Sequence, residues 1–329
     1  MQHYIVLDLE WNQSPAGKEG QTSSLPFEII EIGAVKLNES MKKVGEFRRL
    51  IRPQVYGELH SAIADVVHMD MEELKENGVE FPQAFEEFIQ WCGSDGIYCT
   101  WGSMDLTELQ RNAVFYGMEN PFPKPFLYYD IQKLYSLQFR DGREKPSLEL
   151  AVERFDLEEG EAFHRALADA GYTAKVLSCL DFETVKPYWS VDYYRPPANR
   201  EEEIYLVFPD YSKYVSRTFD SKEEAIEDKL VSDLLCYRCK RMLKKKVKWF
   251  SVNQKYYFAL GSCPEHGYLK GKIRMKKSED GKIFAVKTQK LVSEEYAKLI
   301  YEKREETKKK RTEKLKLKRS QKKGRMLKK

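Results

Sequence analysis

The sequence predicts an α/β fold for residues 1–185, followed by a smaller β-rich unit and a basic C-terminal segment. Three observations lead to this prediction. Strand-like runs alternate with helical stretches in the first half of the chain. The charge reverses along the chain, with about 17 Lys and Arg against about 32 Asp and Glu in residues 1–185, and about 39 against about 20 thereafter. A cluster of Cys and His appears only in the second half, which indicates a different kind of unit there.

The first half is expected to form a mixed sheet flanked by helices. Two β-rich runs, HYIVLDLEW and FEIIEIGAVKL, are separated by a polar loop rich in Gly, Pro and Ser, and EFRRLIRP is a plausible third strand. Apolar residues at helical spacing then predict helices over ADVVHMDMEELKEN and FPQAFEEFIQWCG. The strands GIYCTWG and FLYYD and the remaining helices follow, in DLTELQRNAVFYG, IQKLYSLQF, PSLELAVERFDL and HRALADAGYTAKVLSCL.

The second half is predicted to contain a linker, a β-rich module and a tail. Residues 186–203 are rich in Pro and charge and indicate a linker. Within 204–292, one hairpin is expected over VKWFSVNQKYYFAL and another over YLKGKIRMKK and KIFAVKTQKLV. From Ser293 the chain is predicted to be helical, but residues 302–329 carry 15 Lys and Arg against 4 Glu. We therefore expect 293–329 to be a basic helical or disordered tail.

Acidic residues stand at the ends of predicted strands in the first half. Asp8 and Glu10 are two residues apart, so in a strand both point to the same side, at the end of an apolar run. Asp105 follows another strand and begins a helix. His164 and Asp169 are five residues apart, a spacing that suits a His just before a helix and an Asp inside its first turns. Ala166, Ala168 and Ala170 would allow that helix to pack close to the sheet.

Four carboxylates at one point would repel each other strongly unless cations lay between them. Oxygen ligands favour Mg²⁺ or Mn²⁺, and two such ions can clamp the attacking and leaving oxygens of a phosphodiester displacement. A histidine that titrates near neutral pH can take the proton of the attacking water. The pattern therefore indicates metal-dependent hydrolysis of a phosphodiester.

The order Asp8-x-Glu10, Asp105, His164-x4-Asp169 resembles the DEDDh 3′→5′ exonuclease family, which has a ribonuclease H-like fold, and is most similar to its ERI-1 and KapD-like branch. The resemblance covers roughly residues 1–180. It implies that the four carboxylates hold two Mg²⁺ or Mn²⁺ ions, that His164 is the general base, and that Trp11 contacts the 3′-terminal nucleotide. It also implies a single-stranded 3′ end as substrate, RNA before DNA, and nucleoside 5′-monophosphates as products.

The cysteines divide into two groups. Cys92, Cys99 and Cys179 stand singly in apolar surroundings and are expected to be buried free thiols. The others form Cys236-x2-Cys239 and Cys263-x2-His266, two knuckles on either side of a predicted hairpin. A closed set of three thiolates and one imidazole is typical of a structural zinc site, so one Zn²⁺ is predicted in a zinc-ribbon-like module. A metal site also fits a reducing compartment better than a disulfide framework does.

Basic and aromatic residues are interleaved around the predicted ribbon. Basic side chains can hold phosphates and aromatic rings can stack on bases, although about half of these aromatics are expected to form the core of the ribbon. The set comprises Lys244, Lys245, Lys246, Lys248, Lys270, Lys272, Arg274, Lys276 and Lys277, with Trp249, Phe250, Tyr256, Tyr257 and Phe258. We therefore expect a nucleic-acid partner for this module.

Two other functions fit the same residues. One is a DNA proofreading or repair exonuclease, and the other is a nucleic-acid-binding protein whose nuclease domain is inactive. Neither a secretory signal nor an apolar stretch of about 20 residues is apparent, so we expect a cytoplasmic protein without a membrane partner. The sequence does not indicate an oligomeric state.

Overall fold

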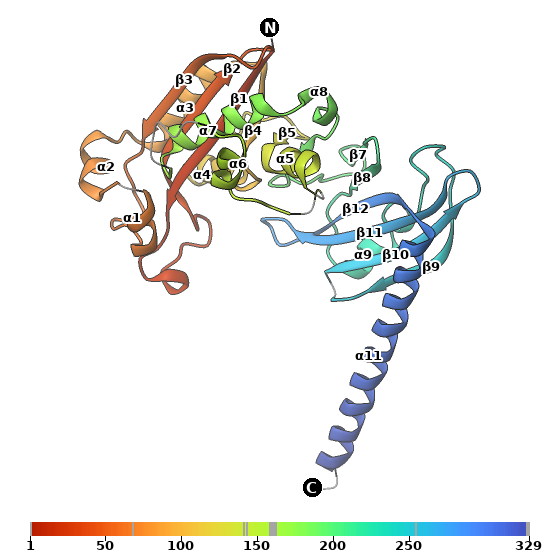
Figure 1. The fold of residues 1–329 in the computed structure, drawn as a ribbon. Helices are drawn as coiled ribbons and strands as arrows, with labels where there is room; N and C mark the ends of the chain where they lie inside the picture. Colours follow the sequence, from red (N-terminus) through yellow and green to blue (C-terminus); the bar gives the residue numbers. More distant parts are fainter. Residues whose placement is uncertain are drawn as a thin grey trace. The chain divides into compact units, whose positions relative to one another are not determined.

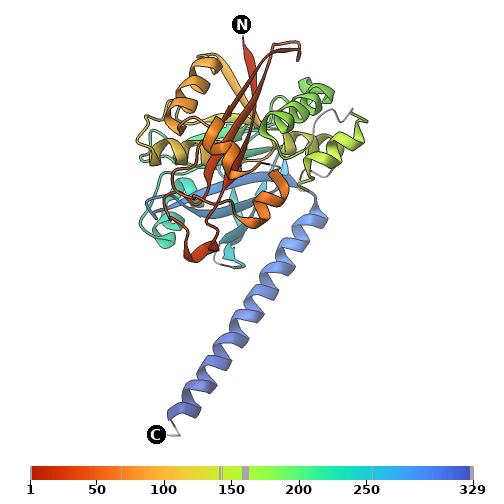
Figure 2. The same ribbon diagram turned by 90° about the vertical axis from the view of Figure 1, so that its left-hand side faces the viewer.

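The computed structural model describes residues 2–67, 69–140, 142, 144–157, 163–253 and 255–326. The chain divides into two compact units, Met1–Tyr194 and Arg195–Lys329. Both are coloured by sequence in Figures 1 and 2. No helix in the described part of the chain has the length and apolar character needed to cross a membrane.

The first unit is built on a six-stranded mixed sheet with the order β3-β2-β1-β4-β5-β6. Strand β1 pairs antiparallel with β2 and parallel with β4, while β3 and β6 form the antiparallel edges. This confirms the predicted mixed sheet. The strands are β1 (His3–Asn12), β2 (Glu28–Leu37), β3 (Lys43–Leu50), β4 (Gly96–Thr100), β5 (Leu127–Asp130) and β6 (Ser190–Val191).

Helices cover both faces of this sheet, as the two views show (Figures 1 and 2). Because strand side chains alternate, Ile5, Leu7 and Leu9 of β1 point into a core with α3 (Phe81–Cys92) and α4 (Met104–Phe115). Tyr4 and Val6 point into the opposite core. That second core is completed by α5 (Ile131–Phe139), α6 (Leu148–Arg154) and α7 (Ala166–Cys179).

The first unit differs from the predictions in three places. The single helix expected over 64–77 is two helices, α1 (Ser61–Val67) and α2 (Met71–Asn77), because Asp70 caps α2 by accepting a hydrogen bond from the Glu73 N–H. Within 186–203, β6 pairs with β5 and the boundary between the units follows Tyr194. Cys92 and Cys99 are buried, but Cys179 is exposed at the end of α7, so its expected burial was wrong. The remaining elements are η1 (Gly17–Glu19) and α8 (Phe182–Val185).

The second unit is built on an antiparallel sheet with the order β7-β8-β12-β11-β10-β9. The two predicted hairpins are joined, because β10 pairs with both β9 and β11. The strands are β7 (Ile204–Val207), β8 (Tyr211–Val215), β9 (Lys244–Ser251), β10 (Tyr256–Cys263), β11 (Gly267–Lys277) and β12 (Ile283–Val292). The helices are α9 (Lys222–Glu227), α10 (Lys229–Ser232) and the long α11 (Glu294–Met326), drawn in blue in Figure 1.

Candidate active site

Two carboxylates project from one face of β1. Asp8 and Glu10 alternate with the buried Leu7 and Leu9, so the acids lie on the same face as α7 while the leucines fill the other core. Both acids are partly buried. In the antiparallel pair with β2, Glu10 lies opposite Glu31, which places a third carboxylate on the same face.

Helix α7 reaches these acids because a glycine leaves room for its first turn. Gly33 lies opposite Asp8 in the sheet, and a Cβ at this position would lie 2.1 Å from the carbonyl carbon of Ala166. No side chain fits there, so the backbone of α7 begins directly on the strand. The predicted small residues Ala166, Ala168 and Ala170 are all buried in this contact region. This close packing brings Asp169, in the first turn of α7, to Asp8 and Glu10.

Three of the predicted ligands meet. Asp8, Glu10 and Asp169 each offer a carboxylate oxygen, and these oxygens all lie within 4.8 Å of one another. The predicted fourth ligand, Asp105, lies in the first turn of α4 and is 5% exposed. It stands outside the three-residue group but is the nearby charge that acts most strongly on Asp8. Backbone hydrogen bonds from Leu9 and from Asp105 itself hold its carboxylate.

His164 precedes α7, as its spacing from Asp169 predicted. The helix begins at Ala166, and His164 lies two residues earlier with a φ of +66°, in the left-handed region that few non-glycine residues adopt. Its backbone N–H donates a hydrogen bond of 3.1 Å to Oδ2 of Asp169. A strained backbone conformation of this kind persists only where the surrounding structure fixes it. Here the hydrogen bond holds His164 next to Asp169.

The site is electrostatically unfavourable as long as it holds only carboxylates. Burial, followed by Asp105, Glu10, Asp169 and Glu31, raises the pKa of Asp8 well above its usual range. Burial and the neighbouring acids raise the pKa of Glu10 to about 8. Burial also raises the pKa of Asp105 to about 7 and that of Asp169 to about 6, the latter against the opposing hydrogen bond from His164. These raised pKa values show that bound protons or cations are more favourable in the cluster than four bare negative charges.

The sequence suggested only a structural or rim charge at Glu31 and gave no role to Arg165. The Glu31 side chain is fully buried and accepts hydrogen bonds from Arg48 Nε and, at 3.3 Å each, from Arg165 Nε and the Ala166 N–H. It thereby holds the N-terminus of α7. The charge of Arg165 partly opposes the rise in the pKa of Glu10, so it supplies positive charge at the edge of the cluster. The only sequence signal was the position of Glu31 in the strand beside Glu10.

Trp11 lies just beyond a register shift between Glu10 and Trp11 in the pairing of β1 with β2. Its ring is partly buried, packs against the core of β1 and α4, and lies 5.7 Å from the Phe27 ring. Its neighbour Asn12 is fully buried and donates to the Glu58 carbonyl at 2.8 Å while it accepts from the His60 N–H. The predicted contact of Trp11 with a nucleotide stays a prediction.

The residues at this site fit divalent cations. Oδ1 of Asp169 is buried and has no hydrogen-bond partner among the described residues, although an unpaired buried carboxylate oxygen costs free energy. It belongs to a group of three converging carboxylates with raised pKa values. Oxygen donors of this kind suit Mg²⁺ or Mn²⁺ rather than a softer metal.

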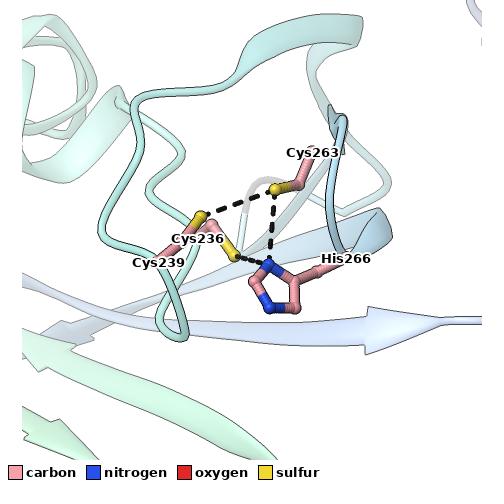
Figure 3. A group of neighbouring side chains, drawn as sticks. All are labelled: Cys236, Cys239, Cys263 and His266. Carbon is pink, nitrogen blue, oxygen red and sulfur yellow. Dashed lines mark hydrogen bonds between the residues drawn. The ribbon is translucent and has the colours of Figure 1, made fainter.

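The second predicted cluster also comes together, in the second unit (Figure 3). Cys236 Sγ and Cys263 Sγ each lie 3.6 Å from Nδ1 of His266, and Cys239 Sγ lies 3.6 Å from Cys263 Sγ. Ligands at zinc distances from one tetrahedral ion are about 3.6–3.8 Å apart, whereas a disulfide needs about 2.05 Å. Burial raises the pKa of the Cys263 thiol, but hydrogen bonding to His266 and backbone groups outweighs it and brings the pKa to about 6.

Comparison with known proteins places the first unit among exonucleases. The family model RNase_T, described as exonuclease, matches residues 5–177. A probable 3′-5′ exonuclease, KapD of Bacillus subtilis (strain 168), is 28% identical over 182 residues, which cover 54% of this chain and 83% of that protein. The nuclease domain of 3′hExo, a DEDDh family member bound to rAMP, is similar with a TM-score of 0.48 and 18% identity over 58% of this chain and 96% of that one. Pop2p of S. pombe, in its Mg²⁺- and Mn²⁺-bound form, has a TM-score of 0.41 and 16% identity, over 54% and 82%.

Proposed function

Because the chain belongs to the DEDDh 3′→5′ exonuclease family, we propose that it removes nucleotides from a single-stranded 3′ end, RNA in preference to DNA. The products are nucleoside 5′-monophosphates. One observation carries the proposal: Asp8, Glu10 and Asp169 offer carboxylate oxygens within 4.8 Å of one another. Oδ1 of Asp169 is buried without a hydrogen-bond partner among the described residues, and its Oδ2 accepts from the backbone N–H of His164. An inactive nuclease domain would gain nothing from carboxylates that repel each other.

Asp8, Glu10, Asp105 and Asp169 would hold two divalent cations, Mg²⁺ or Mn²⁺. Bound there, the pair would neutralise the scissile phosphate and stabilise both the attacking and the leaving oxygen. The protein itself supplies the fixed geometry. Asp8 and Glu10 are fixed by the buried strand, and Asp169 is fixed by Gly33, by Glu31 and by the N–H of His164.

His164 is proposed as the general base that takes the proton of the attacking water. Its position before the helix lets the side chain leave the α7 surface, while its backbone stays bonded to Asp169. The His164 side chain is partly exposed, so a water molecule can reach the imidazole. Trp11, one residue beyond Glu10, is proposed to contact the 3′-terminal nucleotide.

The second unit is proposed to be a zinc-stabilised nucleic-acid-binding module. Cys236, Cys239, Cys263 and His266 form a closed set of four ligands, which leaves no position for a substrate and indicates a structural Zn²⁺. A small sheet of this kind gains folding free energy from the metal. Its basic surface would offset the acidic character of the first unit towards a polyanion.

Paired substrates test the proposed function. Two 5′-labelled single strands of the same sequence, one RNA and one DNA, would be incubated with the protein and Mg²⁺, with EDTA as control. We expect shortening from the 3′ end, faster on RNA, and none in EDTA. Faster shortening of DNA would overturn the RNA preference. If neither the RNA nor the DNA is shortened, the exonuclease assignment is overturned.

A further inference from the structure

The two faces of the second sheet differ sharply in what covers them. On β11, Leu269, Ile273 and Met275 point to the face that α9, α10 and Trp249 cover. A Cβ at Gly271 on this face would lie 2.6 Å from both Leu234 and Trp249. This face is therefore a packed core, and its aromatic residues belong to folding.

The alternate residues of β11 point to the opposite face, and three in a row are cations. Lys270, Lys272 and Arg274 follow each other at every second position, about 6.6 Å apart. Lys270 and Lys272 are partly buried and Arg274 is exposed. None of the three forms an ion pair with a carboxylate in the part of the chain that the structure describes. Such a row of uncompensated like charges is unfavourable without an anion.

Aromatic rings lie beside this row on the neighbouring strand. Tyr256 pairs with Arg274 across the strands, and Phe258 pairs with Lys272, so the rings and the cations share one face. The Lys272 Nζ lies 5.0 Å from the centre of the Tyr256 ring. Both rings are partly exposed.

Helix α11 adds further positive charge to the same face. Its first turns pack through Ala297 and Ile300 onto Val247 and Leu260. These two residues lie on the same face of the sheet as Phe258, opposite the face that α9 and α10 cover. One turn later, the Nζ of Lys303 lies 4.4 Å from the centre of the Phe258 ring. At the other end of the row, Arg274 borders a hollow of about 370 Å³ that is also lined by Lys222, Lys255, Lys276 and Lys277.

We propose that Tyr256, Phe258, Lys270, Lys272 and Arg274, here called the basic-aromatic face, bind single-stranded nucleic acid. The cations would contact successive phosphates along β11, and the two rings would stack on unpaired bases. Exposed rings beside a row of cations favour a single strand, since the bases of a duplex are stacked on each other and cannot reach them. The inference rests on the proposed function only in taking nucleic acid as the substrate.

Binding of a 5′-labelled single strand to the full chain, followed by fluorescence anisotropy in EDTA over a range of salt, tests the charges. Lys272→Gln/Arg274→Gln should weaken binding and flatten the logarithmic salt dependence by about 0.7 for each lost phosphate contact. The matched control is Lys229→Gln/Lys282→Gln, which removes two exposed cations outside the face. Equal affinities of wild type and both double variants at all salt concentrations would overturn the proposal.

A second pair of variants tests the stacking. Tyr256→Leu should weaken binding of the single strand about tenfold, because Leu keeps the apolar volume but loses the flat ring. Tyr205→Leu, an exposed tyrosine of β7 outside the face, should bind like wild type. In a competition assay, polyglutamate and the unlabelled strand would each displace the labelled strand. If polyglutamate competes as well as the strand does, and Tyr256→Leu has no effect, the face binds anions in general and the proposal is overturned. RNA and DNA probes in parallel show which single strand binds more tightly.

Cleavage of a dinucleotide with Mg²⁺ separates this proposal from the exonuclease assignment. A dinucleotide has a single phosphodiester, so it cannot supply the successive phosphates that Lys270, Lys272 and Arg274 would contact. If the face has no role, the dinucleotide is cleaved and the face variants bind the long strand normally. If the exonuclease assignment fails instead, the dinucleotide stays intact while binding still falls in the face variants.

Discussion

The carboxylate cluster of the first unit and the Cys/His cluster of the second each contain four predicted metal ligands, but their geometry differs. The Cys/His atoms already lie at 3.6 Å, the spacing of a tetrahedral zinc site. The carboxylates repel each other and have raised pKa values, and Asp105 stands outside the group of three. Four ligands at tetrahedral spacing suit a structural ion. Carboxylates that repel each other suit ions that also bind a substrate.

The largest effect is expected at the carboxylates. Asp8→Asn or Asp169→Asn removes one charge that a cation needs, so the rate of 3′-end hydrolysis should fall at least about 10³-fold. Binding of a single strand in EDTA should change little. Asp95→Asn, an exposed acid in a loop, is the control and should keep the wild-type initial rate. Full activity of either site variant would show that hydrolysis does not require these carboxylates.

The next largest effect is expected at the Cys/His cluster. Cys263→Ser should lose the zinc and lower the unfolding temperature of the second unit, since metal binding there contributes several kcal/mol to folding. The matched control is Cys179→Ser, an exposed cysteine of the first unit. Metal analysis and thermal unfolding measure the two variants. A Cys263→Ser protein with one tightly bound zinc per chain would contradict a four-ligand site.

A smaller effect is expected at Arg165, which positions α7 through Glu31. Arg165→Met should lower kcat about tenfold, because Asp169 would be held less firmly, and leave KM for a short strand and the unfolding temperature nearly unchanged. Arg165→Lys should restore part of kcat. Arg140→Met, an exposed arginine paired with Glu144, serves as control. A loss of stability without a loss of kcat would assign Arg165 a purely structural role.

The smallest effect concerns pH and stability. The pKa of Glu10 is raised from 4.5 to about 8, so between these values the native state binds more protons than the unfolded state. The free energy of unfolding of the cation-free protein should therefore fall as pH rises through this range. Glu10→Gln should make this fall shallower, and Glu19→Gln, an exposed acid, should not. Urea unfolding at several pH values measures the slope, and identical slopes for all three proteins would contradict the raised pKa.

The sequence predicted those parts of the fold and site that depend on local pattern. Alternation in β1 predicted that Asp8 and Glu10 share a face, and the spacing to Asp169 predicted that His164 precedes its helix. What it could not provide are contacts between distant segments. The close approach at Gly33 joins residues more than 130 positions apart, and the same distance separates Glu31 from Arg165. No local propensity encodes such contacts.

The break between α1 and α2 shows a second limit. Apolar spacing alone continued the predicted helix through Asp70, but a side-chain cap can end or begin a helix regardless of the apolar pattern. In the second sheet, alternation along β11 was visible in the sequence. Which of its faces is covered depends on α9, α10 and Trp249, and therefore could be known only from the fold.

Titration with Mn²⁺, followed by electron paramagnetic resonance in the presence of a nucleoside 5′-monophosphate, measures whether the carboxylate cluster is the divalent-cation site. We predict two bound Mn²⁺ per wild-type chain, displaced by Mg²⁺, the same number in Cys263→Ser, and weaker or incomplete binding in Asp169→Asn. Unchanged Mn²⁺ binding in Asp169→Asn would contradict a cation site at these carboxylates.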